Sequence, residues 1–346
     1  MLMTSIPGML WKSRIDDAPV ALDSAGEICV VVGSEGEVSA LSAMDGTLVS
    51  RTRIDGGLVW GAVDPRGRRV VLTGPFGAWL WEPHTANLTS LSEGQWCARA
   101  YWVSEERFAV AIGRSIAVFN RAGDRLWTSD QYASTVTDLA WLGGWHKLAV
   151  ASYGGVNIVE PRSAGVVTHM PFKGSLLAIA ASPNGRWIVS GNQDSTLQVF
   201  RSDKDTRLEM EGYPFKISRV AFDSMGRYLA NDGAPEVSVW DFGGNGPRGR
   251  APVLLTSATE SEGADIADFA WHPSQPMLAV GWGSGEVLLY MPSKGTEGKP
   301  LSAIREVLGS GPDIRALHWH ADPLLLLVAD SEGSVFALDV DEEGTP

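Results

Sequence analysis

Charged and aromatic side chains recur at one position of a repeating pattern in this sequence. The position holds Trp60, Arg99, Asp138, Arg219 and Asp268. Arginine and aspartate in neighbouring units can form ion pairs, whose contribution depends on how dry their surroundings are. The same residue types can also bind a partner, because arginine and tryptophan often dominate interface energetics. The sequence therefore leaves two interpretations open, structural ion pairs between units or a polar and aromatic binding site.

A second position of the repeat carries groups that could ligate a divalent metal. It holds Asp23, Asp64, Asp223, His272 and His320. Each of these residues precedes a turn, however, where a short polar side chain can hydrogen-bond the backbone beyond it. Positions in different units are also too far apart to share one ion unless they converge. Turn capping is therefore the favoured interpretation, and the sequence predicts no metal site.

Two long loops, residues 242–250 and 292–300, form a third candidate, because they are basic in an otherwise acidic chain. Their basic residues are Arg248, Arg250, Lys294 and Lys299. Both loops join the third strand of a unit to its fourth, so we expect them on one face, as a secondary interaction site or as solvated loops. A third insertion, residues 257–264, is acidic and is expected simply to be solvated.

Catalytic signatures are missing from the sequence. It contains no GxSxG, HExxH or Walker loop, and no GxGxxG that directly follows a strand. Cys29 and Cys97 are far apart and form no CxxC pair. Among the six histidines, His318 and His320 flank Trp319, an arrangement more typical of locally hydrogen-bonded side chains than of a ligand site. We predict no catalytic residues and no cofactor.

Charge and hydropathy limit the classes of partner. The net charge of −13 argues against nucleic acid as a general partner, because binding phosphates requires a concentrated basic surface. No segment approaches 18 consecutive apolar residues, so no membrane span is expected. The first residues lack the basic start and apolar stretch of a signal peptide, which favours the cytoplasm.

The candidate positions must be held by short strands, which are clearest in residues 265–291. This stretch contains three apolar runs separated by His-Pro-Ser-Gln and Gly-Ser-Gly turns, as in an antiparallel meander. Similar units follow one another along the chain at a period near 40 residues, which is typical of four-stranded propeller blades. Their first strands end at the anchor residues Leu22, Val63, Trp102, Trp141, Ala181, Phe222, Trp271 and Trp319.

The final unit lacks an outer strand, which the N-terminus can supply. Fourth strands follow in seven units, whereas the eighth ends after its third strand. Residues 9–15 form a suitable strand, and closing the ring with them would remove open edges. We therefore predict an all-β, single eight-bladed propeller with four-stranded antiparallel blades. One domain would span residues 1–346, with blade 8 formed by 312–340 plus 9–15; seven blades plus a stray unit is the alternative.

Three units resemble the WD-repeat β-propeller family most closely, namely residues 182–200, 223–241 and 271–290. The family's terminal Trp-Asp pair occurs once, at Trp240-Asp241, no Gly-His pair opens a repeat, and the turn aspartate is kept at Asp194. The resemblance implies a non-catalytic scaffold that binds protein partners.

The innermost strands of such a ring face its axial channel, so the position of Trp60, Arg99, Asp138, Arg219 and Asp268 is expected at the channel mouth. We predict that a protein partner binds there. The alternative is an enzyme of the quinoprotein or lactonase kind, with a small ligand or metal in the channel, because residues 43–51 also resemble quinoprotein segments.

Overall fold

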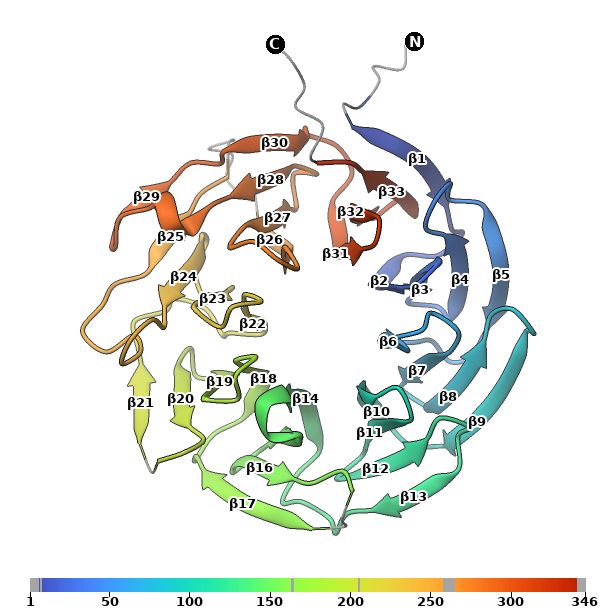
Figure 1. Cartoon of the computed structure of the whole chain (residues 1–346), viewed down its shortest axis with the longest axis horizontal. Coiled ribbons are helices and arrows are strands. Elements are labelled where there is room, and N and C mark those ends of the chain that lie inside the picture. Colours follow the sequence, from blue (N-terminus) through green and yellow to red (C-terminus); the bar gives the residue numbers. More distant parts are fainter. Residues whose placement is uncertain (1–5, 7, 163–164, 205, 258–264, 341–346) are drawn as a thin grey trace.

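The computed structural model describes residue 6 and residues 8–162, 165–204, 206–257 and 265–340. Within these residues, strands form eight sheets that surround a central axis like the blades of a propeller (Figure 1), and all but one pairing of neighbouring strands are antiparallel. The two helices among them are single 3-10 turns at Gly143–Trp145 and Pro292–Lys294. The prediction of an all-β, eight-bladed propeller is confirmed.

Blades 1 to 4 each contain four consecutive strands. Blade 1 contains β2 (Pro19–Ala25), β3 (Ile28–Gly33), β4 (Glu37–Ser42) and β5 (Leu48–Arg53). Blade 2 contains β6 (Trp60–Val63), β7 (Val70–Gly74), β8 (Gly77–Glu82) and β9 (Asn87–Glu93). Blade 3 contains β10 (Cys97–Ser104), β11 (Arg107–Ile112), β12 (Ser115–Asn120) and β13 (Arg125–Thr128). Blade 4 contains β14 (Val136–Leu142), β15 (Lys147–Ser152), β16 (Gly155–Val159) and β17 (Val166–Pro171).

The remaining blades depart from this scheme at two places. Blade 5 contains β18 (Leu176–Ala181), β19 (Trp187–Asn192), β20 (Leu197–Arg201) and β21 (Arg207–Met210). Blade 6 contains β22 (Val220–Phe222), β23 (Tyr228–Asn231), β24 (Val237–Asp241), β25 (Val253–Leu255) and a fifth strand, β29 (Pro300–Leu301). Blade 7 contains β26 (Ile266–Trp271), β27 (Leu278–Trp282), β28 (Val287–Tyr290) and β30 (Arg305–Leu308). Blade 8 contains β31 (Ile314–Ala321), β32 (Leu324–Asp330), β33 (Ser334–Leu338) and β1 (Met9–Arg14).

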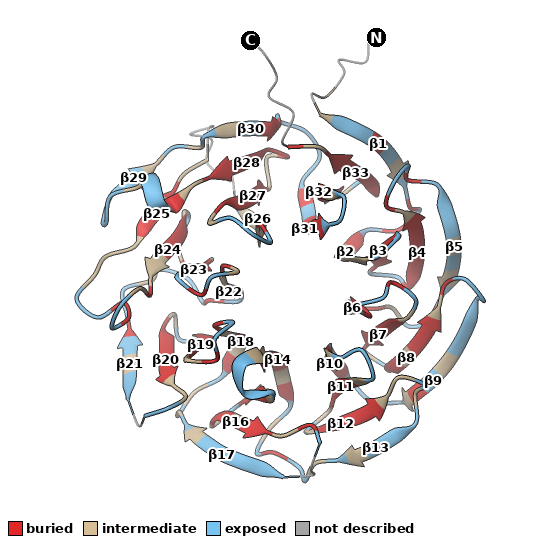
Figure 2. Ribbon diagram, viewed as in Figure 1, coloured by how far each residue is buried: buried red, intermediate tan, exposed pale blue. Residues whose placement is uncertain are grey.

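Burial changes from the axis to the rim of each blade. Every residue of the second strand β3 is buried, whereas the outer strand β5 is partly or fully exposed throughout. Figure 2 shows the same trend around the ring, with exposed residues along the outer strands. Second strands are apolar on both faces because neighbouring blades cover both of them, and their valines and isoleucines favour extended backbone. The near-continuous apolar runs of the sequence thus mark strands buried from two sides.

The ring is closed by the two ends of the described chain. Strand β1 pairs antiparallel with β33, from Met9 opposite Leu338 to Arg14 opposite Ser334. The Trp11 side chain is buried, and its Nε1 donates to the backbone oxygen of Ala43 in blade 1 at 2.9 Å. The predicted closure by the N-terminal strand is confirmed.

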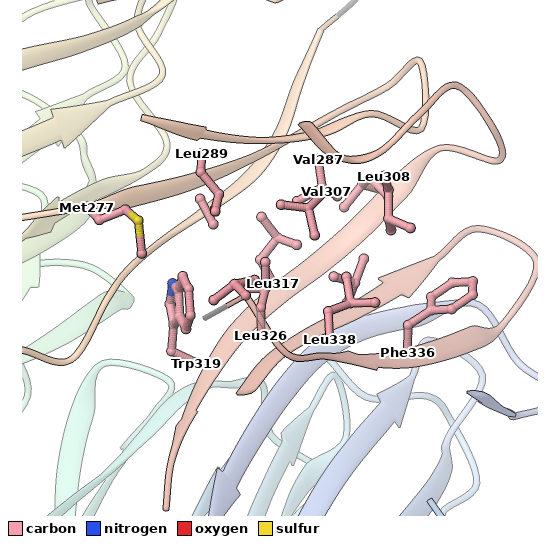
Figure 3. Close-up of a cluster of buried hydrophobic side chains, with 14 residues drawn as sticks. Met277, Val287, Leu289, Val307, Leu308, Leu317, Trp319, Leu326, Phe336 and Leu338 are labelled. Carbon is pink, nitrogen blue, oxygen red and sulfur yellow. The ribbon is translucent and has the colours of Figure 1, made fainter. Parts of the chain in front are cut away.

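The core is divided into clusters between adjacent blades. Figure 3 shows the cluster between blades 7 and 8, where Leu289 of one blade and Leu326 of the next point toward the same space. Trp319 completes this cluster near the axis and Phe336 near the rim, both about one-twentieth exposed (6 %). Because every blade shares its core with two neighbours, the position of each inner strand depends on the whole ring.

The fifth strand of blade 6 was not predicted from the sequence. It comes from the loop that follows β28 in blade 7, and it pairs parallel to β25, with Leu254 opposite Pro300 and Leu255 opposite Leu301. In Figure 1, β29 lies on the outer rim beside β25. The loop of one blade therefore covers the outer edge of its neighbour, where an unpaired strand would otherwise be exposed.

Strand order defines two faces of the ring. The mouth face is formed by the loops that lead into the innermost strands and by the turns between second and third strands. The opposite face is formed by the turns between first and second strands and by the loops between third and fourth strands.

Two further features bear on the class of protein. Among the described residues, no helix has the length and apolarity to cross a membrane. Cys29 and Cys97 are both buried, and neither forms a disulfide bond.

Candidate binding site at the axial channel

A cavity of about 540 Å³ lies on the axis and is lined by the innermost strands. The structure brings all five residues of the first predicted position to this cavity, namely Trp60, Arg99, Asp138, Arg219 and Asp268. A second cavity of about 540 Å³ adjoins the mouth face and shares Val20 and Arg219 with the first. The five residues that share this position of the repeat therefore line the axial channel.

Arg99 connects three neighbouring blades. Its guanidinium carbon lies 3.8 Å from the ring centroid of Trp60 in blade 2, a distance suited to a cation–π interaction. Its Nε donates to Asp138 Oδ1 in blade 4 at 2.8 Å. The two oxygens of Asp138 also accept hydrogen bonds from the backbone N–H groups of Leu139 and, in blade 5, Ile179, each at 2.9 Å. These contacts form a continuous chain of side-chain interactions from blade 2 to blade 5.

Blades 6 to 8 repeat this arrangement. The guanidinium of Arg219 is paired with Asp268 Oδ1 in the next blade. Asp268 accepts hydrogen bonds from the backbone N–H of Phe269 at 2.8 Å and from that of Leu317 in blade 8 at 2.9 Å. Burial disfavours the charged carboxylate more than Arg219 and these donors favour it, so the pKa of Asp268 is raised. The structural ion pairs expected from the sequence are thus present, and both also line the cavity.

A third carboxylate of the same kind lies at Asp23, where the sequence analysis was wrong. Asp23 was interpreted as a turn residue, but it lies inside β2, because this strand continues to Ala25, three residues beyond the anchor residue Leu22. Its Oδ2 accepts from the N–H of Val63 in blade 2 at 2.7 Å, and its Oδ1 lies 3.5 Å from His318 Nε2 in blade 8. Aligning the units on strand pairing instead of anchor residues would have revealed it.

The other residues of that second position do cap turns. Asp64 Oδ1 accepts from the N–H groups of Arg68 and Arg69 at 2.5 and 2.8 Å. His272 Nδ1 accepts from the backbone of the following turn, including Ser274 at 3.1 Å. His320 is bonded through Nε2 to its own turn, at Asp322 O. In the part of the chain that the structure describes, no three His, Cys, Asp or Glu side chains come together in a metal-binding group.

The mouth face carries exposed aromatic side chains that the sequence analysis missed. Phe76 and Tyr153 lie in turns between second and third strands, and Trp96 and Phe215 lie in loops that lead into innermost strands. Their exposed fractions are 59 % and 48 %, and 42 % and 52 %, respectively. These residues could have been found in the sequence, because they are large aromatic residues in polar turns, where they cannot contribute to a strand.

The four basic residues of the long loops lie on the opposite face, as the sequence predicted. Arg250 Nη1 is 2.8 Å from Asp241 Oδ2. Arg248, Lys294 and Lys299 are exposed. The acidic insertion 257–264 falls, except for Ser257, outside the described residues.

Eight radial sheets around a lined channel define a β-propeller. Residues 166–201, which span blade 4's outer strand and most of blade 5, match the family described as WD domain, G-beta repeat. The fold is similar to the crystal structure of the computationally designed Ika8 protein, with a TM-score of 0.75 and 16 % identity over 96 % of this chain and 100 % of that one. It is also similar to a chain in the crystal structure of a Mitotic Checkpoint Complex, with a TM-score of 0.61 and 16 % identity over 79 % of this chain and 88 % of that one. Comparison with curated proteins gives no match.

Proposed function

We propose that this propeller is a non-catalytic platform that binds a protein partner at its mouth face. The observation that carries the proposal is the combination of an axial cavity lined by paired charges with exposed aromatic side chains on the same face. Binding sites of proteins are commonly concave regions with a few fixed polar groups. Exposed aromatic residues and arginine are the residue types enriched in interfaces.

The proposed site is pre-organised by the blades. Arg99 and Arg219 keep 31 % and 44 % of their side chains exposed while each is held by an aspartate from the next blade. Those aspartates are in turn fixed by backbone donors of two blades. Side chains already held in place lose little conformational entropy on binding. A partner that inserts a polar or apolar group into the channel would therefore meet a rigid site.

The fold comparison is consistent with such a role. One similar chain belongs to a structure titled as a complex, so this fold occurs in a protein that assembles with others. For the present chain, we propose assembly through the mouth face and, as expected from the sequence, a cytoplasmic location. The partner is proposed to be a protein, in keeping with the net charge of −13, which disfavours nucleic acid.

The proposal can be tested by affinity purification from the native host with wild-type protein and two variants, Trp60→Ala and Arg219→Ala. Proteins captured by the wild type and depleted in both variants would identify the partner. We expect losses of about 2 kcal/mol or more in binding free energy, as for interface hot spots. Melting curves are essential for Trp60→Ala, because Trp60 also packs against the cores on both sides of blade 2. Equal capture by well-folded variants would contradict the proposal.

One observation favours an enzyme as the second candidate. Asp23 and His318 form a carboxylate–imidazole pair on the channel-facing strands, and burial raises the pKa of Asp23 despite the neighbouring His318. Such pairs are used in general acid–base chemistry. Absorbance spectra and metal analysis of purified protein distinguish the candidates, because a bound quinone or a stoichiometric metal ion would favour the enzyme.

A further inference from the structure

The two basic loops on the opposite face are built into one surface. The backbone N–H of Gly298 donates to Pro252 O at 2.8 Å, and the N–H of Leu254 donates to Lys299 O at 3.2 Å. These bonds continue the parallel pairing of β29 with β25 toward the loop. The blade 7 loop is thereby fixed along the segment that follows the blade 6 loop, and the basic residues of both loops lie on one continuous support.

The blade 6 loop is also fixed against blade 5. Gly246 has a φ of +92°, and a Cβ at this position would lie 2.7 Å from the Trp187 ring. Its close contact with the ring therefore requires glycine. On the same ring, the guanidinium carbons of Arg186 and Arg201 each lie 5.2 Å from the centroid. The contact at Gly246 therefore fixes the blade 6 loop against blade 5, where Arg201 is itself paired with Asp203 at 2.7 Å.

Positive charge on this surface is only partly neutralised. We define the basic platform as Arg227, Arg248, Arg250, Lys294 and Lys299. Arg227 and Arg250 share one carboxylate, Asp241, at 3.1 and 2.8 Å. Within the described residues, no ion pair joins Arg248, Lys294 or Lys299 to an acid, and all three are exposed. The platform therefore carries a net positive charge on a chain whose net charge is −13.

From this charge arrangement we propose that the basic platform is a second interaction surface, which binds an acidic, extended segment of a protein partner. The site is independent of the channel mouth and lies on the opposite face. Arginine forks bind carboxylates in a directed way, and lysines add unspecific attraction. Complementary charge of this kind raises association rates and selects partners.

A short acidic segment fits the platform better than a long polyanion. Nucleic acid carries a phosphate charge about every 1.7 Å of duplex, so it would extend beyond the platform. On the same face as the platform, blade 3 carries the exposed acid Asp124, and its exposed acids Glu105 and Glu106 are paired with Arg66 of blade 2. Because charges act over about 10 Å at ordinary salt, the basic platform would attract only the part of a polyanion or an anionic membrane that lies directly over it.

The test is binding of a fluorescein-labelled oligoglutamate peptide by fluorescence anisotropy at low salt and at increasing NaCl. We expect the wild type to bind with salt-dependent affinity. The variant Arg248→Glu/Lys299→Glu should bind at least about tenfold more weakly, a change equivalent to about 1.4 kcal/mol. The matched control is Lys173→Glu/Lys216→Glu, which changes net charge equally with exposed residues of the mouth face. It should bind the peptide within about twofold of the wild type.

Three results would overturn the proposal. They are absence of peptide binding by the wild type at low salt, an equal loss in the control variant, and tighter binding of a DNA duplex or of phosphatidylserine vesicles through the same two residues. Arg219→Ala, a mouth variant, should bind oligoglutamate like the wild type. The proposal can thus fail while the mouth site stands, or stand while the mouth site fails.

Discussion

The carboxylate of Asp268 accepts a hydrogen bond from the backbone N–H of Leu317 in the next blade, with 2.9 Å between Oδ2 and N. Asp138 makes the same contact to Ile179 and Asp23 makes it to Val63. In each case a cationic or ionisable side chain of the preceding blade approaches the carboxylate from the other side. These aspartates join three blades at the channel, so the residues that line the proposed site also hold the ring together.

Asp138→Ala should therefore destabilise the fold. The substitution leaves the backbone N–H groups of Leu139 and Ile179 without their acceptor and Arg99 without its partner. We expect a loss of about 2–3 kcal/mol in the free energy of unfolding, as for hydrogen bonds to a buried charged group. Urea unfolding measures the loss. Asp265→Ala, which removes an exposed carboxylate from the mouth face, should change stability by less than about 0.5 kcal/mol.

The stability contributed by Asp268 should decrease as pH rises. Its pKa in the folded protein is raised above the usual 3.8, mainly by burial. The folded state then binds more protons than the unfolded state between 3.8 and the raised pKa. Asp268 therefore stabilises most below pH 3.8, and this contribution is lost as pH rises through the folded-state pKa.

Comparison of wild type with Asp268→Asn tests this sign. The amide cannot titrate, so the stability of the variant relative to the wild type should improve from about pH 4 to pH 7. Asp45→Asn is a control in which the pH dependence should have the opposite sign. Hydrogen bonds from Thr47 lower the pKa of the exposed Asp45, so its contribution to stability is lost as pH falls. If the difference in stability between wild type and Asp268→Asn did not change with pH, a raised pKa of Asp268 in the folded protein would be contradicted.

The N-terminal strand should be indispensable for a closed ring. Deletion of residues 1–16 removes β1 and exposes β33, an apolar strand whose free edge can pair with other chains. We expect aggregation or loss of cooperative unfolding, measured by size-exclusion chromatography and thermal melting. A truncated protein that stays monomeric and melts at the wild-type temperature would argue against closure by β1.

A point substitution distinguishes the loss of ring closure from the effect of shortening the chain. Trp11→Ala removes a buried ring and its hydrogen bond to Ala43, and it should cost about 3–5 kcal/mol. Leu10→Ala, at the adjacent residue with 53 % exposure, should have a small effect. Equal losses from the two substitutions would contradict a specific role of Trp11.

The fold was predictable because the apolar strand patterns, the spacing of the units and the missing outer strand all indicated the same architecture. Second strands such as residues 28–33 are apolar throughout, and the missing eighth outer strand matched residues 9–15. The channel position of Arg99 and Asp138 followed from the repeat alone. Asp23 was misplaced because Leu22 was taken as the end of the first strand, whereas β2 continues to Ala25 before the chain turns.

Contacts between distant loops were not predictable. Strand β29 pairs with β25 through only two residue pairs, and neither Pro300 nor Leu301 has a distinctive pattern. The aromatic residues of the mouth face were similarly hidden. Phe76 and Trp96 lie in separate turns whose common orientation depends on the geometry of the whole ring.

The most direct test of the proposed function compares two sets of exposed apolar residues. The variant Phe76→Ala/Trp96→Ala/Phe215→Ala removes exposed aromatic side chains from the mouth face. The control Met44→Ala/Trp145→Ala/Met225→Ala removes side chains of comparable or greater exposure from the opposite face. The measurement is the dissociation constant of each variant for the partner captured by the wild type. We predict at least about thirtyfold weaker binding for the mouth variant, equivalent to about 2 kcal/mol, and wild-type affinity for the control. Wild-type affinity in the mouth variant, or a loss confined to the control, would contradict a binding site at the channel mouth.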